Sequence, residues 1–262
     1  MKRDSGEFFL LAGWEYTGDA PFQRLYTRHW RATPGGFLQL LQDAWRNSAT
    51  IKRAFAAFRP DTVYLNTVRS ALLVLVCGIR FPGCRLILRD RDIRMPRLVP
   101  WLLRKGLHFE VSAISEKVAA KWHGENVTIR ENQLDEEAIR RTVPYQYPFK
   151  GPILIQVADF VPWKRHDLFL KMLAEAREKN PSIHGVIKGR VHTPEDERWL
   201  AEIRRLQSEL GLDEALLIDT QDIPALPFIA GADTLVSCAT DEPYGRAIQE
   251  ARILGKRVII NS

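Results

Sequence analysis

The feature that most constrains the fold of this 262-residue chain is the alternation of strand and helix patterns in its second half. Short apolar runs recur there, each separated from the next by a segment whose apolar residues have helical spacing. This alternation is typical of a parallel sheet with helices on both faces, the doubly wound α/β arrangement. The expected strands are Ile153–Val157, Ile183–Ile187, Ala215–Ile218, Thr234–Ser237 and Arg257–Ile260, and the expected helices are Asp167–Glu178, Pro194–Leu210, Ile223–Ile229 and Tyr244–Leu254.

The first half of the chain alternates in a similar but less regular way. Apolar runs typical of strands are separated by segments with helical spacing, which again favours parallel sheets covered by helices. Residues 71–76 fit either a helix or a buried strand. The other expected strands are Phe8–Ala12, Val63–Leu65, Arg85–Leu88, Phe109–Ala113 and Val127–Ile129, and the expected helices are Phe37–Phe58, Leu98–Arg104 and Glu116–Trp122.

Residues 142–152 separate the two halves and contain three prolines and one glycine, a composition typical of a linker. The sequence therefore predicts two Rossmann-like α/β domains, residues 1–145 and 146–262, facing each other across a cleft. The second half stops on a strand, one short of the six-strand Rossmann pattern, and the first half lacks the glycine-rich turn that usually opens such a domain. We therefore expect the C-terminal domain to be incomplete and the chain to lack both ends.

Charge is distributed unevenly along the chain. Residues 1–150 carry 24 Lys and Arg against 15 Asp and Glu, and residues 151–262 carry 14 against 17, so that +9 and −3 sum to the net +6. This asymmetry indicates two different units, of which the first meets something anionic. The most apolar run, Ala71–Cys77, is far shorter than the ~20 residues needed to cross a bilayer. Without a convincing signal peptide or a cysteine framework, we expect a cytoplasmic protein.

The sharpest motif lies within residues 241–250, where Glu242 and Glu250 are separated by seven residues. Pro243 suits the first helical position, so backbone N–H groups of the following turn would point toward a bound diphosphate. Those groups belong to Tyr244, Gly245 and Arg246. Two carboxylates flanking an anion site suit a ligand with hydroxyls at both ends and phosphates between, such as a nucleotide-sugar. The alternative is that Glu242 is an acidic neighbour of the helix start and Glu250 a surface charge.

A second motif, residues 157–167, reads as a strand, a loop with a basic pair and then a helix. Lys164 would lie at the carboxyl edge of the sheet, where an ammonium group can meet phosphate oxygens. Arg165 would add a second positive charge. The alternative for both residues is a solvated loop.

Residues 80–105 hold eight basic side chains against two acidic ones, and they include Arg89, Arg91 and Arg94 with Trp101 nearby. Basic residues beside an interfacial aromatic suit an anionic membrane surface or an anionic lipid-linked acceptor. The alternative is a solvated rim over a core helix. Nucleic acid explains the charge less well, because no nucleic-acid-binding motif accompanies it.

The same segment contains an Asp-x-Asp pair, Asp90 and Asp92, that suits a divalent cation when both carboxylates share one face of an extended segment. Three-residue patterns are common by chance, and the neighbouring arginines can neutralise both carboxylates. We therefore expect neither a metal site nor a cofactor.

The second half of the chain resembles the nucleotide-binding domain of the retaining glycosyltransferases of family 4, the large two-domain GT-B group. The resemblance runs continuously across residues 152–262 and rests on residues 155–164, 186–189, 222–233 and 242–259. The first half is more loosely similar to the acceptor-side domain of that family, at residues 60–64, 112–116 and 129–135.

The resemblance implies a role for each matching residue. Glu242 is similar to the glutamate that contacts the donor sugar, Glu250 to the one that holds the ribose, and Lys164 to the lysine that neutralises the departing diphosphate. The other donor-side residues would contribute backbone N–H groups, base contacts or charge; they are Tyr244, Gly245, Arg246, Gly189 and Arg165.

Two positions depart from the family pattern. Asp159 stands where the family usually has an arginine, five residues before the lysine, so the cationic clamp is weakened or supplied elsewhere, by Arg165 or Arg246. The family often has a histidine after the strand that corresponds to Arg85–Leu88, and residues 89–92 of this chain contain none.

The resemblance implies transfer of a sugar from a nucleotide-sugar donor to a hydroxyl of a glycan or lipid-linked acceptor, with retention of anomeric configuration. Catalysis would be mainly electrostatic and would need no metal. The expected setting is polysaccharide or lipopolysaccharide synthesis for the cell envelope or capsule, in the cytoplasm and peripherally on the inner membrane face. The alternatives are a non-catalytic or fragmentary nucleotide-sugar-binding subunit, and a sugar-nucleotide epimerase on the same fold.

Overall fold

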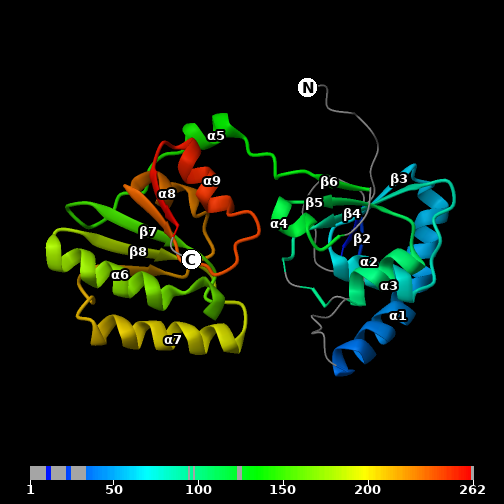
Figure 1. The fold of residues 1–262 in the computed structure, drawn as a ribbon, viewed down its shortest axis with the longest axis horizontal. Helices are drawn as coiled ribbons and strands as arrows, with labels where there is room; N and C mark the ends of the chain where they lie inside the picture. The colour runs from blue at the N-terminus through cyan, green and yellow to red at the C-terminus, as the bar shows by residue number, and fades with distance from the viewer. Residues whose placement is uncertain are drawn as a thin grey trace. The chain divides into compact units, whose positions relative to one another are not determined.

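The computed structural model describes residues 10–12, 22–24, 34–93, 95–96, 98–122 and 126–260. The chain divides into two compact units, Met1–Glu131 and Asn132–Ser262. No strand of one unit belongs to a sheet of the other among the described residues, and the sheets of both units are parallel (Figure 1).

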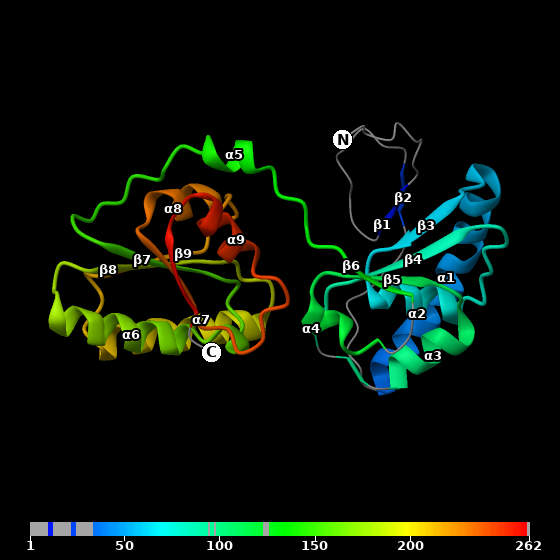
Figure 2. The ribbon, with the colours of Figure 1, turned by 45° about the horizontal axis from the view of Figure 1, so that its top comes forward.

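The second unit is built on a five-stranded sheet in the order β11-β10-β7-β8-β9, in which all neighbouring strands are parallel. Helices α6 (His166–Lys179) and α7 (Pro194–Glu209) cover one face, and α8 (Leu226–Gly231) and α9 (Arg246–Ile253) cover the other (Figure 2). The strands are β7 (Ile153–Val157), β8 (His184–Lys188), β9 (Leu216–Asp219), β10 (Thr234–Ser237) and β11 (Arg257–Ile260).

Apolar side chains on the two faces of this sheet form two cores. Phe160, Phe169 and Leu173 are completely buried with others beneath α6 and α7. Ile155 and Ile229 are completely buried on the opposite face, beneath α8 and α9. Full burial of such side chains stabilises the unit by about 1.5–3 kcal/mol each relative to exposure, so the sheet is a rigid base for the loops at its edges.

The strand order reverses next to β7. The chain passes from β7 outward through β8 and β9, and then returns to form β10 and β11 on the other side of β7. In open α/β sheets, ligands bind outside the carboxyl ends of the strands at such a switch point. The loops that follow β7 and β10 therefore form the edge where a ligand is expected.

The first unit contains a four-stranded parallel sheet, β3-β4-β5-β6, and a separate two-stranded parallel sheet, β1-β2. Its strands are β1 (Leu10–Ala12), β2 (Phe22–Arg24), β3 (Thr62–Leu65), β4 (Arg85–Asp90), β5 (Glu110–Ala113) and β6 (Val127–Ile129). Its helices are α1 (Pro34–Phe58), α2 (Val68–Val76), α3 (Leu98–Gly106) and α4 (Glu116–Ala119).

The structure confirms the predicted α/β fold class, with parallel sheets in both halves of the chain. Residues 71–76 belong to helix α2, which starts with a capping box between Thr67 and Ser70. Helix α4 ends at Ala119 rather than at Trp122. Of the strand expected at Phe8–Ala12, residues 8 and 9 lie outside the described residues. Sequence patterns missed β2 and the five-residue helix α5 (Glu136–Arg140), which are too short for a clear period.

Along the chain, the boundary between the units falls between residues 131 and 132, whereas the sequence predicted it after residue 145. The intervening segment packs on the second unit. Arg140 of α5 donates a hydrogen bond to the Ile253 carbonyl at 2.8 Å. The ring of Tyr145 stacks on Phe228, with ring centroids 4.2 Å apart. These contacts explain why the proline-rich residues 142–152 lie within the second unit.

Within the described part of the chain, no helix is long and apolar enough to span a membrane.

Candidate functional site

The loops after β7 and β10 bring two of the predicted site residues into direct contact. The Lys164 Nζ donates a hydrogen bond to the Glu242 Oε2 at 2.6 Å, across a separation of 78 residues in the sequence. The two side chains are 16% and 26% exposed, so the ion pair is partly shielded but still reachable from solvent. A partly buried ion pair at the switch point is a place where an anionic ligand can exchange for the carboxylate.

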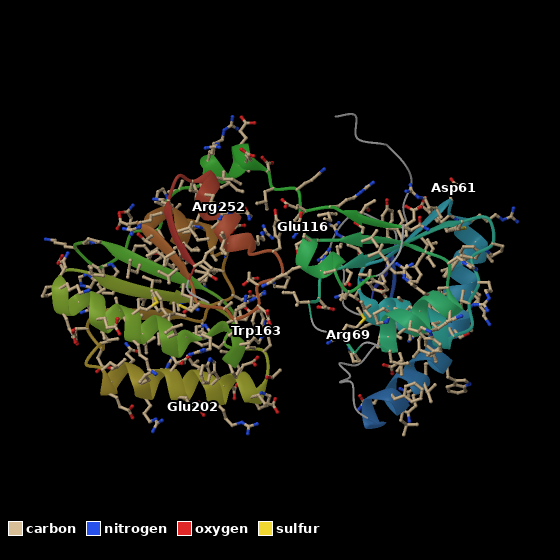
Figure 3. All side chains as sticks on the ribbon, in the orientation of Figure 1. Asp61, Arg69, Glu116, Trp163, Glu202 and Arg252 are labelled. Atoms are coloured by element: carbon tan, nitrogen blue, oxygen red, sulfur yellow. The ribbon has the colours of Figure 1, made fainter. Side chains whose placement is uncertain are left out.

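A short 3₁₀ turn, η1 (Pro162–Lys164), presents the lysine. The Lys164 ammonium lies over the ring of Trp163, 4.2 Å from its centroid, a cation–π contact. The backbone N–H of Thr240, in the loop after β10, donates to the Trp163 carbonyl at 3.2 Å. Figure 3 shows Trp163 at the end of the second unit where β7 leads into α6, away from Glu202 on the outer side of α7. The two loops therefore hold each other at the site.

Helix α9 begins at Arg246, with Gly245 as its N-cap in the left-handed conformation (φ +70°). The prediction that Pro243 occupies the first helical position was therefore wrong. A Cβ on Gly245 would lie 3.2 Å from the Glu242 Cγ and 2.7 Å from the Ile248 Cδ1, so glycine is needed both for its φ and for space. The N–H groups of the first turn of α9, which have no partners within the helix, thus lie next to Glu242.

The other glutamate of the motif, Glu250, is a buried residue of α9, only 7% exposed. Its Oε1 accepts a hydrogen bond from the Arg246 Nε at 2.8 Å, and the arginine side chain is itself 71% exposed. Arg246 and Glu250 therefore form an i,i+4 ion pair within α9. Tyr244 is engaged elsewhere, because its hydroxyl donates to the Asn132 carbonyl at 3.1 Å.

Arg165 follows the lysine directly and adopts φ +54°, which is uncommon outside glycine. Its guanidinium forms two hydrogen bonds with Asp167, from Nε at 3.0 Å and Nη2 at 3.2 Å. Burial alone would raise the pKa of Asp167, but the hydrogen bond and charge of Arg165 outweigh it and lower that pKa. Arg165 is therefore tied to the start of α6 through Asp167.

Asp159, two residues beyond β7, also has partners within the loops. Its Oδ1 accepts from the Arg190 backbone N–H at 3.3 Å and from the Arg190 Nε at 3.4 Å. Arg190 Nη1 in turn lies 3.5 Å from the Asp222 Oδ1. The contact of Arg190 with Asp159 was not predicted from the sequence, although a basic residue after β8 and an acidic residue after β7 were a usable signal. Gly189 permits this approach, because a Cβ there would lie 1.9 Å from the Ala158 carbonyl oxygen.

His166, the first residue of α6, is completely buried beside the site. Its Nδ1 accepts a hydrogen bond from the Trp199 Nε1 at 3.1 Å, and its ring stacks on Phe160 with centroids 4.7 Å apart. Burial lowers the pKa of His166 to about 4, and the positive charge of Lys164 contributes in the same direction. The imidazole is therefore neutral in the folded protein at neutral pH.

We expect folding stability to fall as pH drops from about 6.5 to about 4, because over this range an unfolded chain protonates His166 and the folded protein does not. Between pH 7 and pH 4.5 the loss from this residue is roughly 2–3 kcal/mol. Chemical denaturation at both pH values measures it, as the difference between the natural protein and a His166→Phe variant. A difference below about 0.5 kcal/mol would contradict the neutral, buried imidazole.

The residues predicted for the acceptor or membrane side lie in the first unit. Burial, and then the charges of Arg91 and Arg130, lower the pKa of Arg89 at the end of β4. Trp101 on α3 is 56% exposed and Arg91 is exposed. Arg94 lies outside the described residues.

The two aspartates of the Asp-x-Asp pair, Asp90 and Asp92, form contacts within the first unit. Asp90 is completely buried, its Oδ2 accepts from the Trp122 Nε1 at 2.6 Å, and the Lys121 Nζ lies 2.9 Å away. The Asp92 backbone N–H donates to the Asp90 Oδ1 at 3.0 Å. Across the described ranges, no three His, Cys, Asp or Glu side chains are grouped so that they could hold a metal ion.

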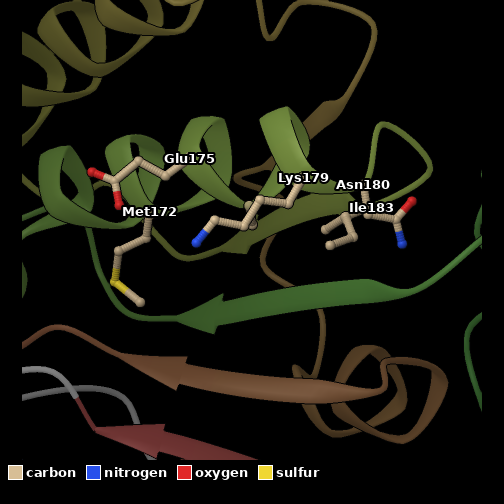
Figure 4. Close-up of a pocket in the computed structure, with 6 residues that line it drawn as sticks. Met172, Glu175, Lys179, Asn180 and Ile183 are labelled. Atoms are coloured by element: carbon tan, nitrogen blue, oxygen red, sulfur yellow. The ribbon is translucent and has the colours of Figure 1, made fainter.

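A separate pocket of about 350 Å³ opens along α6, lined mainly by Met172, Glu175, Lys179 and Ile183 (Figure 4). Ile183 precedes β8, so this pocket is close to the amino ends of the strands. Ligands of open α/β sheets bind at the carboxyl ends, and the Lys164–Glu242 edge is therefore the candidate site.

Residues 143–262 match the family model described as glycosyl transferases group 1. The second unit is similar to that family. The matched range contains Lys164, Glu242 and Glu250. A comparison with curated protein sequences gives no match.

Solved structures extend the similarity to both units. HepE from Anabaena, in complex with UDP and glucose, has a TM-score of 0.70 at 17% identity, and the alignment covers 92% of this chain and 67% of that one. A glycosyltransferase from Rickettsia africae has a TM-score of 0.71 at 16% identity, and the alignment covers 92% of this chain and 66% of that one. Sucrose-phosphate synthase from Thermosynechococcus elongatus has a TM-score of 0.73 at 15% identity, and the alignment covers 94% of this chain and 67% of that one. These likenesses support the GT-B fold class, and the chain spans about two thirds of the length of these structures.

Proposed function

We propose that this protein is a glycosyltransferase that moves a sugar from a nucleotide-sugar donor to a hydroxyl of an acceptor with retention of anomeric configuration. The observation that carries the proposal is the Lys164–Glu242 ion pair beside the N-terminus of α9, at the switch point of the second sheet. Support comes from the match of residues 143–262 to glycosyl transferases group 1.

In this mechanism the donor diphosphate displaces the Glu242 carboxylate from Lys164. The bond between the anomeric carbon and the phosphate oxygen breaks, and negative charge grows on the leaving diphosphate. Lys164 and the N–H groups of the first turn of α9 stabilise that charge. The acceptor oxygen bonds to the anomeric carbon, and its proton passes to a diphosphate oxygen. Glu242, released from the lysine, accepts hydrogen bonds from hydroxyls of the donor sugar.

Glu250 is proposed to hold the ribose hydroxyls of the nucleotide. Its carboxylate is buried and already fixed by Arg246, so it accepts further hydrogen bonds with little loss of side-chain entropy. The remaining donor-side residues have backbone or supporting roles in the proposal: Tyr244 and Gly245 shape the loop before α9, Gly189 lets the loops after β7 and β8 meet, and Arg165 fixes the start of α6 through Asp167.

The first unit is proposed to meet a glycan or lipid-linked acceptor of cell-envelope polysaccharide synthesis, and through it the cytoplasmic membrane face. The exposed apolar side chains of α3, Leu98 and Trp101, lie in the basic segment 80–105, where Lys105 and Arg91 are also exposed. Aromatic and basic groups together favour an anionic interface.

Calorimetry with UDP and UDP-glucose tests the nucleotide site. We expect the natural protein to bind UDP, and we expect Glu250→Gln to weaken UDP binding by about tenfold, because a hydrogen bond to a charged group contributes about 1.5 kcal/mol. Glu175→Gln, an exposed residue of α6 away from the site, serves as the matched control. If neither UDP nor another nucleotide of a donor panel binds, the proposal is rejected. Nucleotide binding with no transfer and no release of UDP from UDP-glucose would instead favour a binding subunit.

A further inference from the structure

A buried glutamine interrupts the apolar central strand of the second unit. Gln156 of β7 is only 2% exposed, follows the completely buried Ile155 and pairs in register with Ile187 of β8. Burying an amide costs free energy unless its polar atoms find partners. A polar residue at this position therefore calls for a specific contact.

That contact is with the lysine of the candidate site. The Gln156 Nε2 donates to the Lys164 backbone carbonyl at 2.7 Å. The other amide atom, Oε1, accepts no hydrogen bond from the part of the chain that the structure describes. An apolar side chain of the same size would avoid this unsatisfied oxygen. Among the described residues, the hydrogen bond to the Lys164 carbonyl is thus the contact of this amide that offsets the cost of burying it.

The 3₁₀ turn that carries the lysine is held at successive carbonyls. The Val161 carbonyl accepts from the Lys164 N–H at 3.0 Å, and the Trp163 carbonyl accepts from the Thr240 N–H at 3.2 Å. Gln156 secures the next carbonyl, that of Lys164, from the sheet below. Fixing this peptide fixes the origin of the lysine side chain, whose ammonium lies 4.2 Å from the Trp163 ring centroid and 2.6 Å from Glu242.

We infer that Gln156 is a positioning residue for the Lys164 ammonium: through the Lys164 carbonyl it sets where the positive charge meets the donor diphosphate. Gln156 itself does not touch the substrate. Because the diphosphate contact belongs to the proposed function, the catalytic consequence rests on that function, whereas the position of the ammonium does not.

A double-mutant cycle tests the catalytic consequence, with release of UDP from UDP-glucose as the turnover assay. We expect Gln156→Met to lower kcat by about tenfold, with a smaller change in KM, since small displacements of a catalytic group cost turnover. In a Lys164→Met background the same substitution should have no further effect. Leu154→Met, on the same face of β7, is the matched control and keeps full turnover. Denaturation checks that every variant is folded.

A spectroscopic readout tests the position without substrate. After reductive methylation with ¹³C-formaldehyde, the N-methyl signal of Lys164, assigned by its absence in Lys164→Met, should be displaced by the ring current of Trp163. We expect Gln156→Met to return it toward the position of exposed lysines, and Leu154→Met to leave it displaced. An unchanged signal in Gln156→Met, or an equal loss of turnover in both backgrounds, would overturn the inference. Full turnover in Lys164→Met would reject the proposed function instead, and the methyl signal would still decide the position.

Discussion

Replacing Lys164 with methionine is expected to lower turnover of a nucleotide-sugar donor by about 10²–10³-fold. The substitution keeps most of the side-chain volume and removes the positive charge that lies 2.6 Å from Glu242. The leaving diphosphate gains negative charge in the transition state, so losing a positioned cation raises the barrier more than it weakens ground-state binding. Single-turnover measurement of UDP release from a saturating donor gives the effect on the chemical step.

Lys171→Met is the matched control for this prediction, because Lys171 is an exposed residue of α6, the helix that follows the site loop. It should keep turnover within about twofold, as expected for surface substitutions away from a functional site. We expect Arg165 not to compensate for the lost lysine, because its guanidinium is hydrogen-bonded to Asp167. A Lys164→Met enzyme as active as the control would show that the diphosphate is neutralised elsewhere.

Glu242→Gln is expected to change binding and turnover in opposite directions. The amide has the size of the carboxylate but no charge, so it no longer competes with a diphosphate for the Lys164 ammonium. We expect UDP to bind roughly three- to tenfold more tightly, as for the loss of a partly exposed competing ion pair. Turnover should fall by about 10²-fold or more, because the carboxylate proposed to contact the donor sugar is gone.

Calorimetry with UDP and the turnover assay measure the two effects of Glu242→Gln on the same sample. Glu202→Gln, on the outer side of α7 (Figure 3), controls for the loss of one negative charge from the second unit. Tighter UDP binding together with lower turnover supports both roles of Glu242. Weaker UDP binding would mean that Glu242 supports the nucleotide directly, and it would remove the ion pair as a competitor.

Most of the fold could be predicted because its signal is local. The alternation of apolar runs and helical segments predicted every strand of the second unit to within a residue or so, and with them the edge that carries Lys164 and Glu242. The start of α9 could not be predicted in this way. Pro243 suits a first helical position, but Gly245 has a positive φ and adopts the left-handed conformation. A residue in that conformation cannot lie inside a right-handed helix, so α9 begins after it, at Arg246.

The sequence alone determined the parallel α/β architecture and the candidacy of Glu242, Glu250 and Lys164 at the carboxyl edge of a sheet, because apolar periodicity is set by short stretches of chain. The strand order, and with it the switch point next to β7, came from the structure. Only the tertiary structure decided which charges meet. Lys164 pairs with Glu242 across 78 residues, and Gln156 lies beneath the lysine peptide. Such contacts depend on how loops from separate strands approach at one sheet edge, and that geometry leaves no periodic trace in the order of the residues.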